Sequence, residues 1–349
     1  MKQHRTIWIT GLLITGIICL LACSKSGQQA AGTHALAFTI PPGFPAPAYR
    51  FEQNNPLTSE GFELGRRLFY DGRLSKDGNF PCSSCHQQFA GFATFDHDLS
   101  HGFNNQFTTR NAPVLSNLVW MKELHWDGGI NNIEVQPLAP LTAPNEMAED
   151  ISTVISKLKK DPGYNQQFTA AFGKGDINSQ KMLKALAQFM GSLVSADSKY
   201  DKVKRGVASF TAAEQTGYAL FQQKKCATCH KEPLFTDLSY RNTGLPLNPS
   251  LKDYGRMHIT NKREDSLKFK VPSLRNVYLS FPYGHDGRFY SLEDVLNHYG
   301  NGVQPGATVD SLVRNKIPLS KEEKYYLKSF LSTLTDTAFA ASKRFSQPQ

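Results

Sequence analysis

The sequence predicts a mainly α-helical protein built from two similar halves. The motif Cys-x-x-Cys-His occurs twice, at residues 82–86 and 226–230, and each copy follows a stretch with helical spacing of apolar residues that contains Gly-x-x-Leu-Phe. Alternation of polar and apolar residues is nowhere long enough to suggest a large sheet. A chain of 349 residues has room for two domains. An internal duplication with one motif in each half accounts for all of these observations.

The first 22 residues are typical of an export signal. Lys2 and Arg5 precede an apolar run that is shorter than the roughly 20 residues needed for a membrane span. The run ends in Leu-Leu-Ala-Cys, which is similar to the lipobox of bacterial lipoproteins, where the cysteine, here Cys23, is acylated and becomes the new N-terminus. Ordinary cleavage and an uncleaved anchor are the alternatives. We therefore predict a lipoprotein signal peptide over residues 1–22 and lipidation of Cys23.

A segment rich in Ser, Gly, Gln and Ala follows, and we expect a flexible tether over residues 23–40. Four prolines between residues 41 and 47 then predict an extended strap that lies on the first half. We expect the first domain over residues 41–205 and the second over residues 206–349, with the join near residues 202–209.

Helices can be placed in both halves. Thr58 is expected to cap a helix in the first half, and Thr211 a helix directly before the second motif. Another helical stretch around residues 183–193 lies between the halves. Two amphipathic helices, each with a serine at the cap position, are expected over residues 291–299 and 320–334.

The similarity between the halves extends beyond these helices. Arg-Asn at residues 110–111 precedes Trp-Asp-Gly at 126–128, and Arg-Asn at 275–276 precedes His-Asp-Gly at 285–287. The segment 232–270 is typical of loops. Because these short sequences occur in the same order in both halves, they support the duplication and identify equivalent segments of the two copies.

The two Cys-x-x-Cys-His motifs predict covalently bound haem. At this spacing two thiols take up both vinyl groups of one haem, and the next histidine ligates its iron. A redox dithiol or half of a zinc site is the alternative, but the histidine follows directly in both copies and no third Cys-x-x-Cys completes a zinc pair. We predict two haem c groups with these attachment cysteines and iron ligands: Cys82, Cys85 and His86 for the first, and Cys226, Cys229 and His230 for the second.

The charge balance points to protein partners and away from nucleic acid. The formal net charge is +9, which would favour contact with an acidic electron-donor protein. A solvated mixed surface explains the same charge equally well. No run of Lys and Arg suggests a nucleic-acid site.

The second axial ligand of each iron separates electron transfer from catalysis. Histidine gives a low-spin carrier, methionine raises the potential, tyrosinate lowers it, and an open position can bind peroxide. Position in the sequence does not choose among the available side chains. The candidates are His97, His101 and His125 in the first half, and Met257, His258, His285, His298 and Tyr299 in the second.

Taken in order, these stretches resemble the bacterial di-haem cytochrome c peroxidases and the related MauG proteins over essentially all of the chain after the tether. The resemblance implies two cytochrome c-like domains, with a low-potential peroxidatic haem in the first and an electron-storing haem in the second. Besides the two haem motifs, the matching stretches are residues 64–69, 110–113, 126–128, 145–147, 271–276 and 282–287.

The resemblance also implies roles around the first haem. His86 would be the proximal ligand of the peroxidatic iron. His101 is similar to the distal histidine that must leave in family members that need reductive activation. Trp126 is similar to the tryptophan that lies between the two haems and helps electrons to pass.

Three further residues stand at the family's spacing from that tryptophan and would line the peroxide pocket: Gln136, Pro140 and Glu146. Glu146 would be the acid/base, because a carboxylate can take the proton from the near oxygen of peroxide and give it to the departing one. The alternative for Glu146 is an acid at the start of a helix, where its charge favours the helix dipole. Glu134 is nearby but lies off the family's position.

Around the second haem the resemblance divides. The distal ligand falls at Tyr299, where conventional peroxidases of the family have methionine and MauG has tyrosine. Tyrosine at this position argues against a high-potential electron store. The chain nevertheless keeps His101, a feature of the peroxidases, so it combines both patterns.

The family also holds a calcium ion between the domains. The side chain of Asn111 and the backbone carbonyls of Ser280 and Pro282 match its ligands, and oxygen ligands suit this cation. Water molecules would complete the shell. Asn111 could instead brace a turn.

These inferences predict an exported, lipid-anchored di-haem c peroxidase on the periplasmic side of a bacterial membrane. Electrons from a small cytochrome c or a cupredoxin would pass through the C-terminal haem to the N-terminal haem and reduce hydrogen peroxide to water. The alternatives are a MauG-like oxidase of a partner protein and a non-enzymatic di-haem electron carrier. Family members often dimerise, although the sequence identifies no interface.

Overall fold

The computed structural model describes residues 32–349; the predicted signal peptide, Cys23 and the first part of the tether lie outside this range. Helices dominate the described part, as predicted. Its strands are β1 (Tyr240–Arg241) and β2 (Phe269–Lys270), which pair antiparallel. Within residues 32–349, none of the helices combines the length and apolar character that crossing a bilayer requires.

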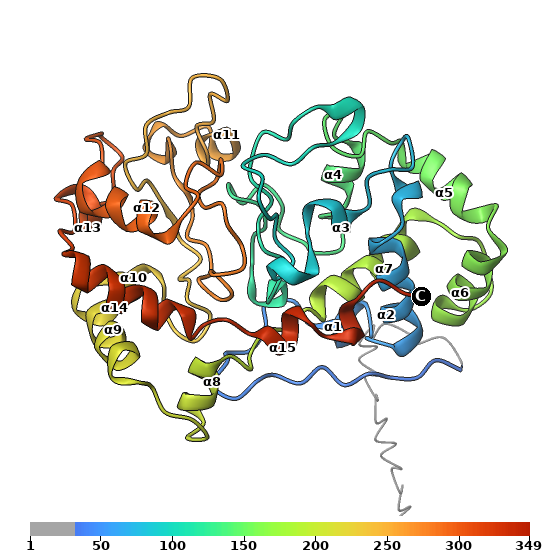
Figure 1. Cartoon of the computed structure of the whole chain (residues 1–349). Coiled ribbons are helices and arrows are strands. Elements are labelled where there is room, and N and C mark those ends of the chain that lie inside the picture. Colours follow the sequence, from blue (N-terminus) through green and yellow to red (C-terminus); the bar gives the residue numbers. More distant parts are fainter. Residues whose placement is uncertain (1–31) are drawn as a thin grey trace, which may run out of the picture.

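The chain forms two lobes that stand side by side (Figure 1). The first lobe holds α1 (Phe51–Asn54), α2 (Ser59–Phe69), α3 (Cys82–Cys85), α4 (Leu138–Thr142), α5 (Ile151–Lys159), α6 (Pro162–Phe172) and α7 (Ser179–Gly191). The second holds α9 (Ala212–Gln223), α10 (Cys226–Cys229), α11 (Met257–Thr260), α12 (Leu292–Asn297), α13 (Ser311–Arg314) and α14 (Lys321–Ser332). Along the edge where the lobes meet run α8 (Lys199–Lys204) and α15 (Thr337–Ala340). Short 3-10 helices are η1 (Gly72–Leu74), η2 (Gln88–Ala90), η3 (Phe103–Asn105), η4 (Leu118–Trp120), η5 (Arg263–Asp265) and η7 (Lys343–Phe345); η6 (His298–Gly302) is a π-helical turn.

The predicted helix caps are present. The Thr58 hydroxyl accepts a hydrogen bond from the Gly61 backbone N–H at 3.0 Å, and α2 begins at the next residue. Thr211 and Ser320 each form a reciprocal capping box at the start of α9 and α14. Each cap satisfies backbone N–H groups that have no partner inside the helix, which explains why these helices start where the sequence predicts.

One helix crossing is repeated in both lobes, and a glycine makes it possible. In the first lobe α2 packs on α7, and in the second α9 packs on α14. A Cβ atom at Gly65 would lie 1.9 Å from the carbonyl oxygen of Ala185, and one at Gly217 would lie 1.9 Å from that of Tyr326. The glycine of Gly-x-x-Leu-Phe therefore lets two helix backbones approach closely, while the motif's phenylalanine enters the core.

Gly217→Ala should destabilise the second lobe. The added methyl group cannot be accommodated without separating α9 from α14, and overpacking of this kind costs about 1–3 kcal/mol. Thermal unfolding of the holoprotein checks this expectation. Gln215→Ala, at an exposed position of the same helix, is the matched control and should leave the melting temperature nearly unchanged. An unchanged melting temperature in Gly217→Ala would contradict the close crossing.

The structure changes one of the matches between the halves that the sequence suggested, that of the two Arg-Asn pairs. The equivalent of Asn276 is Asn117 and not Asn111: both have left-handed backbones, with φ of 61° and 62°. Each also lies four residues after a proline and nine before the first residue of Trp-Asp-Gly or His-Asp-Gly. The two Arg-Asn pairs are therefore not equivalent, and the spacing from proline to asparagine is the signal that identifies the true match.

The two ends of the described chain tie the lobes together. Phe339 and Phe345, near the C-terminus, belong to the core of the first lobe, although the sequence division assigns them to the second domain. In the N-terminal strap, the Pro45 carbonyl accepts a hydrogen bond from the Trp120 indole, and the Phe44 ring lies 4.8 Å from the Arg275 guanidinium of the second lobe. Part of the predicted tether already packs on the first lobe: Nδ1 of His34 lies 2.6 Å from the Glu60 carboxylate, and the Leu36 N–H donates to the Leu57 carbonyl at 2.9 Å.

Candidate functional site

A large cavity takes its lining from both lobes. Its volume is about 850 Å³, and both motif histidines, His86 and His230, line it together with Cys85, Cys226 and Cys229. A smaller cavity of about 60 Å³ shares some of these walls; it is lined by Cys82 as well as Cys85 and His86. Each of the six motif residues therefore lines one or both of two adjoining cavities.

Each motif forms a single helical turn that ends at its histidine. The backbone N–H of His86 donates to the Cys82 carbonyl at 3.0 Å, and that of His230 donates to the Cys226 carbonyl at 3.0 Å. The ring nitrogen Nδ1 of each histidine faces a backbone carbonyl: that of Phe92, at 3.2 Å, for His86, and those of Phe235 and Pro272, at 3.2 and 3.1 Å, for His230. Donation from Nδ1 leaves Nε2 as the atom that can bind a metal.

The protonation states of these side chains suit haem binding. Burial lowers the pKa of His86 to about 4, which keeps its imidazole neutral, as a metal ligand must be. The cysteines of both motifs are free thiols rather than disulfides, and burial raises the pKa of Cys82 to about 12 and that of Cys226 to about 11. Paired thiols, neutral imidazoles and a large interior space are what two haem groups require.

The three predicted peroxide-pocket residues come together around α4. Gln136 lies just before this helix, Pro140 within it, and Glu146 in the turn that follows. All three line both cavities, on walls that they share with His86. Glu146 is not at a helix start, because α5 begins only at Ile151. Burial raises the pKa of the Glu146 carboxyl above its ordinary range.

The loop that carries His101 packs directly on the Glu146 turn. His101 lines the smaller cavity, and its Nδ1 lies 2.7 Å from Oδ1 of Asn105. The backbone N–H of Phe103 donates to the Glu146 carbonyl at 2.7 Å. A Cβ at Gly102 would lie 2.3 Å from the Asn145 carbonyl oxygen, so the two segments touch. The structure thus brings His101 and Glu146 to one wall of the site.

Trp126 lies where the two halves exchange backbone hydrogen bonds. Its carbonyl accepts from the Lys270 N–H at 2.7 Å, and the carbonyl of His285 accepts from the Asn111 N–H at 2.8 Å. Trp126 and His285 are equivalent positions of the repeat, as are Asn111 and Lys270. The Trp126 indole N–H donates to the Asn111 carbonyl at 2.8 Å. The tryptophan is therefore fixed at a reciprocal contact between the lobes.

Arg110 strengthens this contact, and its role was not predicted. Its guanidinium binds both carboxylate oxygens of Asp253 in the second lobe, at 2.6 and 2.9 Å, and also binds Asp127 at 2.6 Å. The Arg-Asn pair in the sequence marks this arginine as a residue of interest. It does not reveal which carboxylate the arginine binds, because that partner becomes a neighbour only in the folded chain.

Tyr299, the distal ligand expected from the resemblance, faces the large cavity. It lies in the π-helical turn η6 and lines the large cavity together with His230. Burial raises the pKa of its hydroxyl, and no residue of the described chain hydrogen-bonds to that hydroxyl. His298 uses Nε2 for the Thr243 carbonyl at 2.9 Å, and Met257 is not part of the cavity wall.

The remaining candidate histidines separate into two groups. His97 is in neither cavity wall. His125, His258 and His285 all line the large cavity; the His285 ring stacks on Phe269 with 3.6 Å between ring centroids.

The three expected calcium ligands line the same cavity. Asn111, Ser280 and Pro282 are all part of its wall. The Asn111 side-chain nitrogen donates to the carbonyls of His97 and Asp98, at 3.3 and 3.0 Å. Asn111 therefore does brace a turn, and this leaves its side-chain oxygen as the atom for a cation.

Comparisons with known proteins identify relatives that match most of the chain. The family model for di-haem cytochrome c peroxidase matches residues 59–209. MauG of Methylorubrum extorquens is 35% identical over 318 residues, which cover 90% of this chain and 87% of that protein. Cytochrome c551 peroxidase of Nitrosomonas europaea is 32% identical, with 80% of this chain and 81% of that protein covered.

Solved structures show the same relationship. A MauG-like protein associated with microbial copper homeostasis superposes with a TM-score of 0.84 at 34% identity, over 90% of this chain and 99% of that chain. The di-haem peroxidase BthA of Burkholderia thailandensis shares the fold, with a TM-score of 0.71 at 22% identity, over 93% of this chain and 99% of that chain. The protein described here belongs to the di-haem cytochrome c peroxidase and MauG family.

Proposed function

We propose that this protein is a di-haem c-type peroxidase that reduces hydrogen peroxide to water with electrons from a small redox protein, a cytochrome c or a cupredoxin. The observation that carries the proposal is the convergence of Gln136, Pro140 and Glu146 on the cavity walls that they share with His86. When bound, the two haem groups supply redox-active iron. The cysteines of the two motifs would hold these groups covalently, and His86 and His230 would bind their iron.

Glu146 moves the proton in this reaction. Reduction of hydrogen peroxide breaks the O–O bond, consumes two electrons and two protons, and yields two molecules of water. The Glu146 carboxylate takes a proton from the peroxide oxygen nearer to His86 and returns it to the departing oxygen. The buried position of Glu146 supports this role, because burial raises the pKa of its carboxyl and so makes the carboxylate a stronger base.

Trp126 carries electrons between the lobes. It is held at the reciprocal hydrogen bonds that join the halves, and it lines the same cavity as both motif histidines. The donor supplies one electron at a time to the second lobe, and two such transfers complete one reduction of peroxide.

A MauG-like oxidation of a partner protein is the second candidate. The observation that favours it is Tyr299, a partly buried tyrosine in the wall of the cavity that His230 also lines. A tyrosinate ligand lowers the potential of a haem iron, which is unfavourable for a site that stores electrons from a donor. Electrons would then come from oxidisable side chains of a partner instead of from a redox protein.

Tyr299→Met separates the two candidates. Methionine as ligand raises the potential of the second site, so the variant should accept electrons from reduced cytochrome c more readily than the natural chain does. Potentiometric titration with optical detection measures the shift, and Tyr325→Met, at an exposed position of α14, is the control that should show none. A potential that is the same in all three proteins would remove Tyr299 as the ligand.

Turnover by the natural chain decides between the functions. Steady consumption of hydrogen peroxide with reduced cytochrome c supports the peroxidase. A long-lived oxidised state with negligible cytochrome turnover supports the MauG-like role. If a reduced sample does not respond to peroxide at all, the protein is an electron carrier.

We further propose that the protein is exported and held on the periplasmic side of a bacterial membrane by a lipid on Cys23. A calcium ion between the lobes is proposed on Asn111, Ser280 and Pro282, whose joint position in the cavity wall supports it.

A further inference from the structure

His125 occupies a backbone position at which the second half of the repeat has glycine. The residue before Trp126 is His125, with φ of 64°, and the residue before the equivalent His285 is Gly284, with φ of 93°. The surrounding turn is the same in both lobes, because Leu124 bridges Ile130 and Tyr283 bridges Phe289. The two copies therefore need a left-handed residue at the same place and fill it differently.

Other left-handed positions of the repeat do not differ in this way. Phe92 and Phe235 are left-handed in the two halves, and so are Asn117 and Asn276. Side chains with a Cβ are disfavoured in this region, whereas glycine adopts it freely. The second half shows, with Gly284, that the turn forms without a side chain at this position. The first half nevertheless has a histidine there. Strain of this kind persists where the side chain is needed, often at functional sites.

The His125 ring contacts the peroxide pocket. Its Nε2 lies 3.4 Å from the side-chain nitrogen of Gln136, and both residues line the large cavity with Glu146 and His86. Burial lowers the pKa of His125, and the nearby charges of Lys270 and Arg110 lower it further while Asp127 raises it. The lowered pKa favours the neutral ring, and in that form its Nε2 can accept a hydrogen bond from the Gln136 amide.

We propose that His125 is a positioning residue of the peroxide pocket, which accepts a hydrogen bond from the Gln136 amide and so fixes the direction in which that amide meets a ligand of the first haem. This role rests on the proposed function, but the experiment that tests it does not require peroxide turnover. Without His125 the Gln136 side chain is free to rotate, and its second N–H no longer points at the ligand.

Cyanide binding to the ferric holoprotein tests this without turnover. His125→Gly and Gln136→Ala should each weaken cyanide binding by roughly tenfold, the effect of losing one ordinary hydrogen bond. The double variant should be no weaker than Gln136→Ala alone, because His125 acts through Gln136. Asn261→Gly, at the exposed left-handed residue that follows α11, is the matched control and should bind cyanide as the natural chain does.

Thermal unfolding distinguishes the effect of losing the imidazole from the effect of changing the backbone strain at residue 125. His125→Gly should melt no lower than the natural chain, because glycine suits this φ, whereas His125→Ala should melt lower and bind cyanide as weakly as His125→Gly. Unchanged cyanide affinity in both variants, or losses that add fully in the double variant, would overturn the proposal. The rate of peroxide reaction in the natural chain is recorded in parallel; if it is negligible, the proposed function fails while the cyanide result still decides the role of His125.

Discussion

Glu146→Gln should slow the reaction of the holoprotein with hydrogen peroxide by about 10²-fold or more, within the range for removal of a general acid–base group. Glutamine has nearly the shape of glutamate, so the pocket keeps its walls, but its amide cannot take a proton from peroxide and return it. The buried position that raises the pKa of Glu146 is the reason for expecting so large an effect. Rapid mixing of the reduced protein with peroxide measures the rate.

The control for this variant is Glu134, another glutamate close to α4. Glu134→Gln changes a side chain that lines neither cavity and accepts a hydrogen bond from the Tyr49 hydroxyl at 2.6 Å, so the peroxide rate should stay unchanged. The pH profile gives a second check. Because the ionised carboxylate takes the first proton, the rate of the natural chain should fall as pH falls through the raised pKa, and this dependence should vanish in Glu146→Gln. A rate near that of the natural chain would remove Glu146 from the mechanism.

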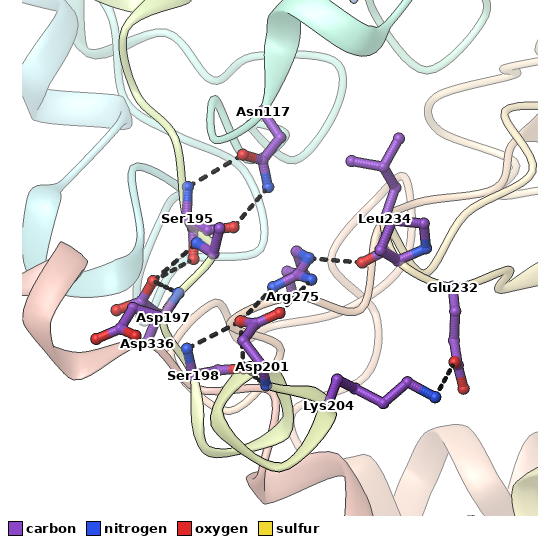
Figure 2. A network of polar contacts seen from close by, with 12 residues as sticks. Asn117, Ser195, Asp197, Ser198, Asp201, Lys204, Glu232, Leu234, Arg275 and Asp336 are labelled. Atoms are coloured by element: carbon purple, nitrogen blue, oxygen red, sulfur yellow. Dashed lines mark hydrogen bonds and ion pairs between the residues drawn. The ribbon is translucent and has the colours of Figure 1, made fainter. Parts of the chain in front are cut away.

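Arg275→Leu should strongly destabilise the protein. The guanidinium is fully buried and binds both carboxylate oxygens of Asp201, at 2.9 and 2.8 Å (Figure 2). It also donates from Nε to the Pro233 carbonyl at 2.8 Å. Removing one partner of a buried ion pair leaves the other charge unpaired, which costs about 3–5 kcal/mol. Thermal unfolding of the holoprotein should show a fall of at least about 5 °C.

This ion pair lies at the centre of a network that joins the lobes. Asp201 also forms the capping box of α8 with Ser198. Beside it, Asp336 accepts hydrogen bonds from the Ser195 hydroxyl and from backbone N–H groups, and Asn117 pairs with the Ser195 backbone. The network connects the segment between the halves, the C-terminal segment and both copies of the repeat. We therefore expect Arg275→Leu to loosen the contact between the lobes as well as the second lobe.

Two further variants test the cause of the loss. Arg275→Leu combined with Asp201→Asn should be more stable than Arg275→Leu alone, because no buried charge is left unpaired. Arg205→Leu, at the end of the same helix, removes an exposed ion pair with Asp197 and should change stability by less than about 1 kcal/mol. Equal losses in Arg205→Leu and Arg275→Leu would contradict the importance of burial.

The pH dependence of stability follows from the same pair. Burial alone would raise the pKa of Asp201. The hydrogen bonds and the positive charge of Arg275, together with the hydrogen bonds from Ser198, outweigh the effect of burial and hold the pKa below its ordinary value. A lowered pKa in the folded state means that the stabilisation is present above the ordinary carboxyl pKa and is lost as pH falls toward the folded-state value. The natural chain should therefore lose stability in acid more steeply than the Asp201→Asn variant.

Local signals were enough to predict the motifs, several helices and the mainly helical class. Cap residues such as Thr58, Thr211 and Ser320 act on N–H groups a few residues away, so they can be identified in the sequence. The helices α5 and α6 were not predicted, although Asp150 and Asp161 cap them in the same manner. Here the missed signal was present and local.

Other features depend on contacts between distant residues and could not be predicted from a single sequence. The return of Phe339 and Phe345 to the first core joins residues that the repeat assigns to different halves. The bridge from Arg110 to Asp253 has no local signature. The positions of Gln136 and Glu146 around the first motif were predicted from spacing within a family, and the cavity wall that they share explains why the spacing matters.

The proposed reaction requires that each paired cysteine motif binds one haem covalently. The direct measurement is mass spectrometry of the acid-denatured protein after extraction with organic solvent. We expect the pigment to stay with the polypeptide and the mass to exceed that of the processed chain by two haem groups. Pigment that passes into the solvent, or a mass increase of a single haem, would contradict the account.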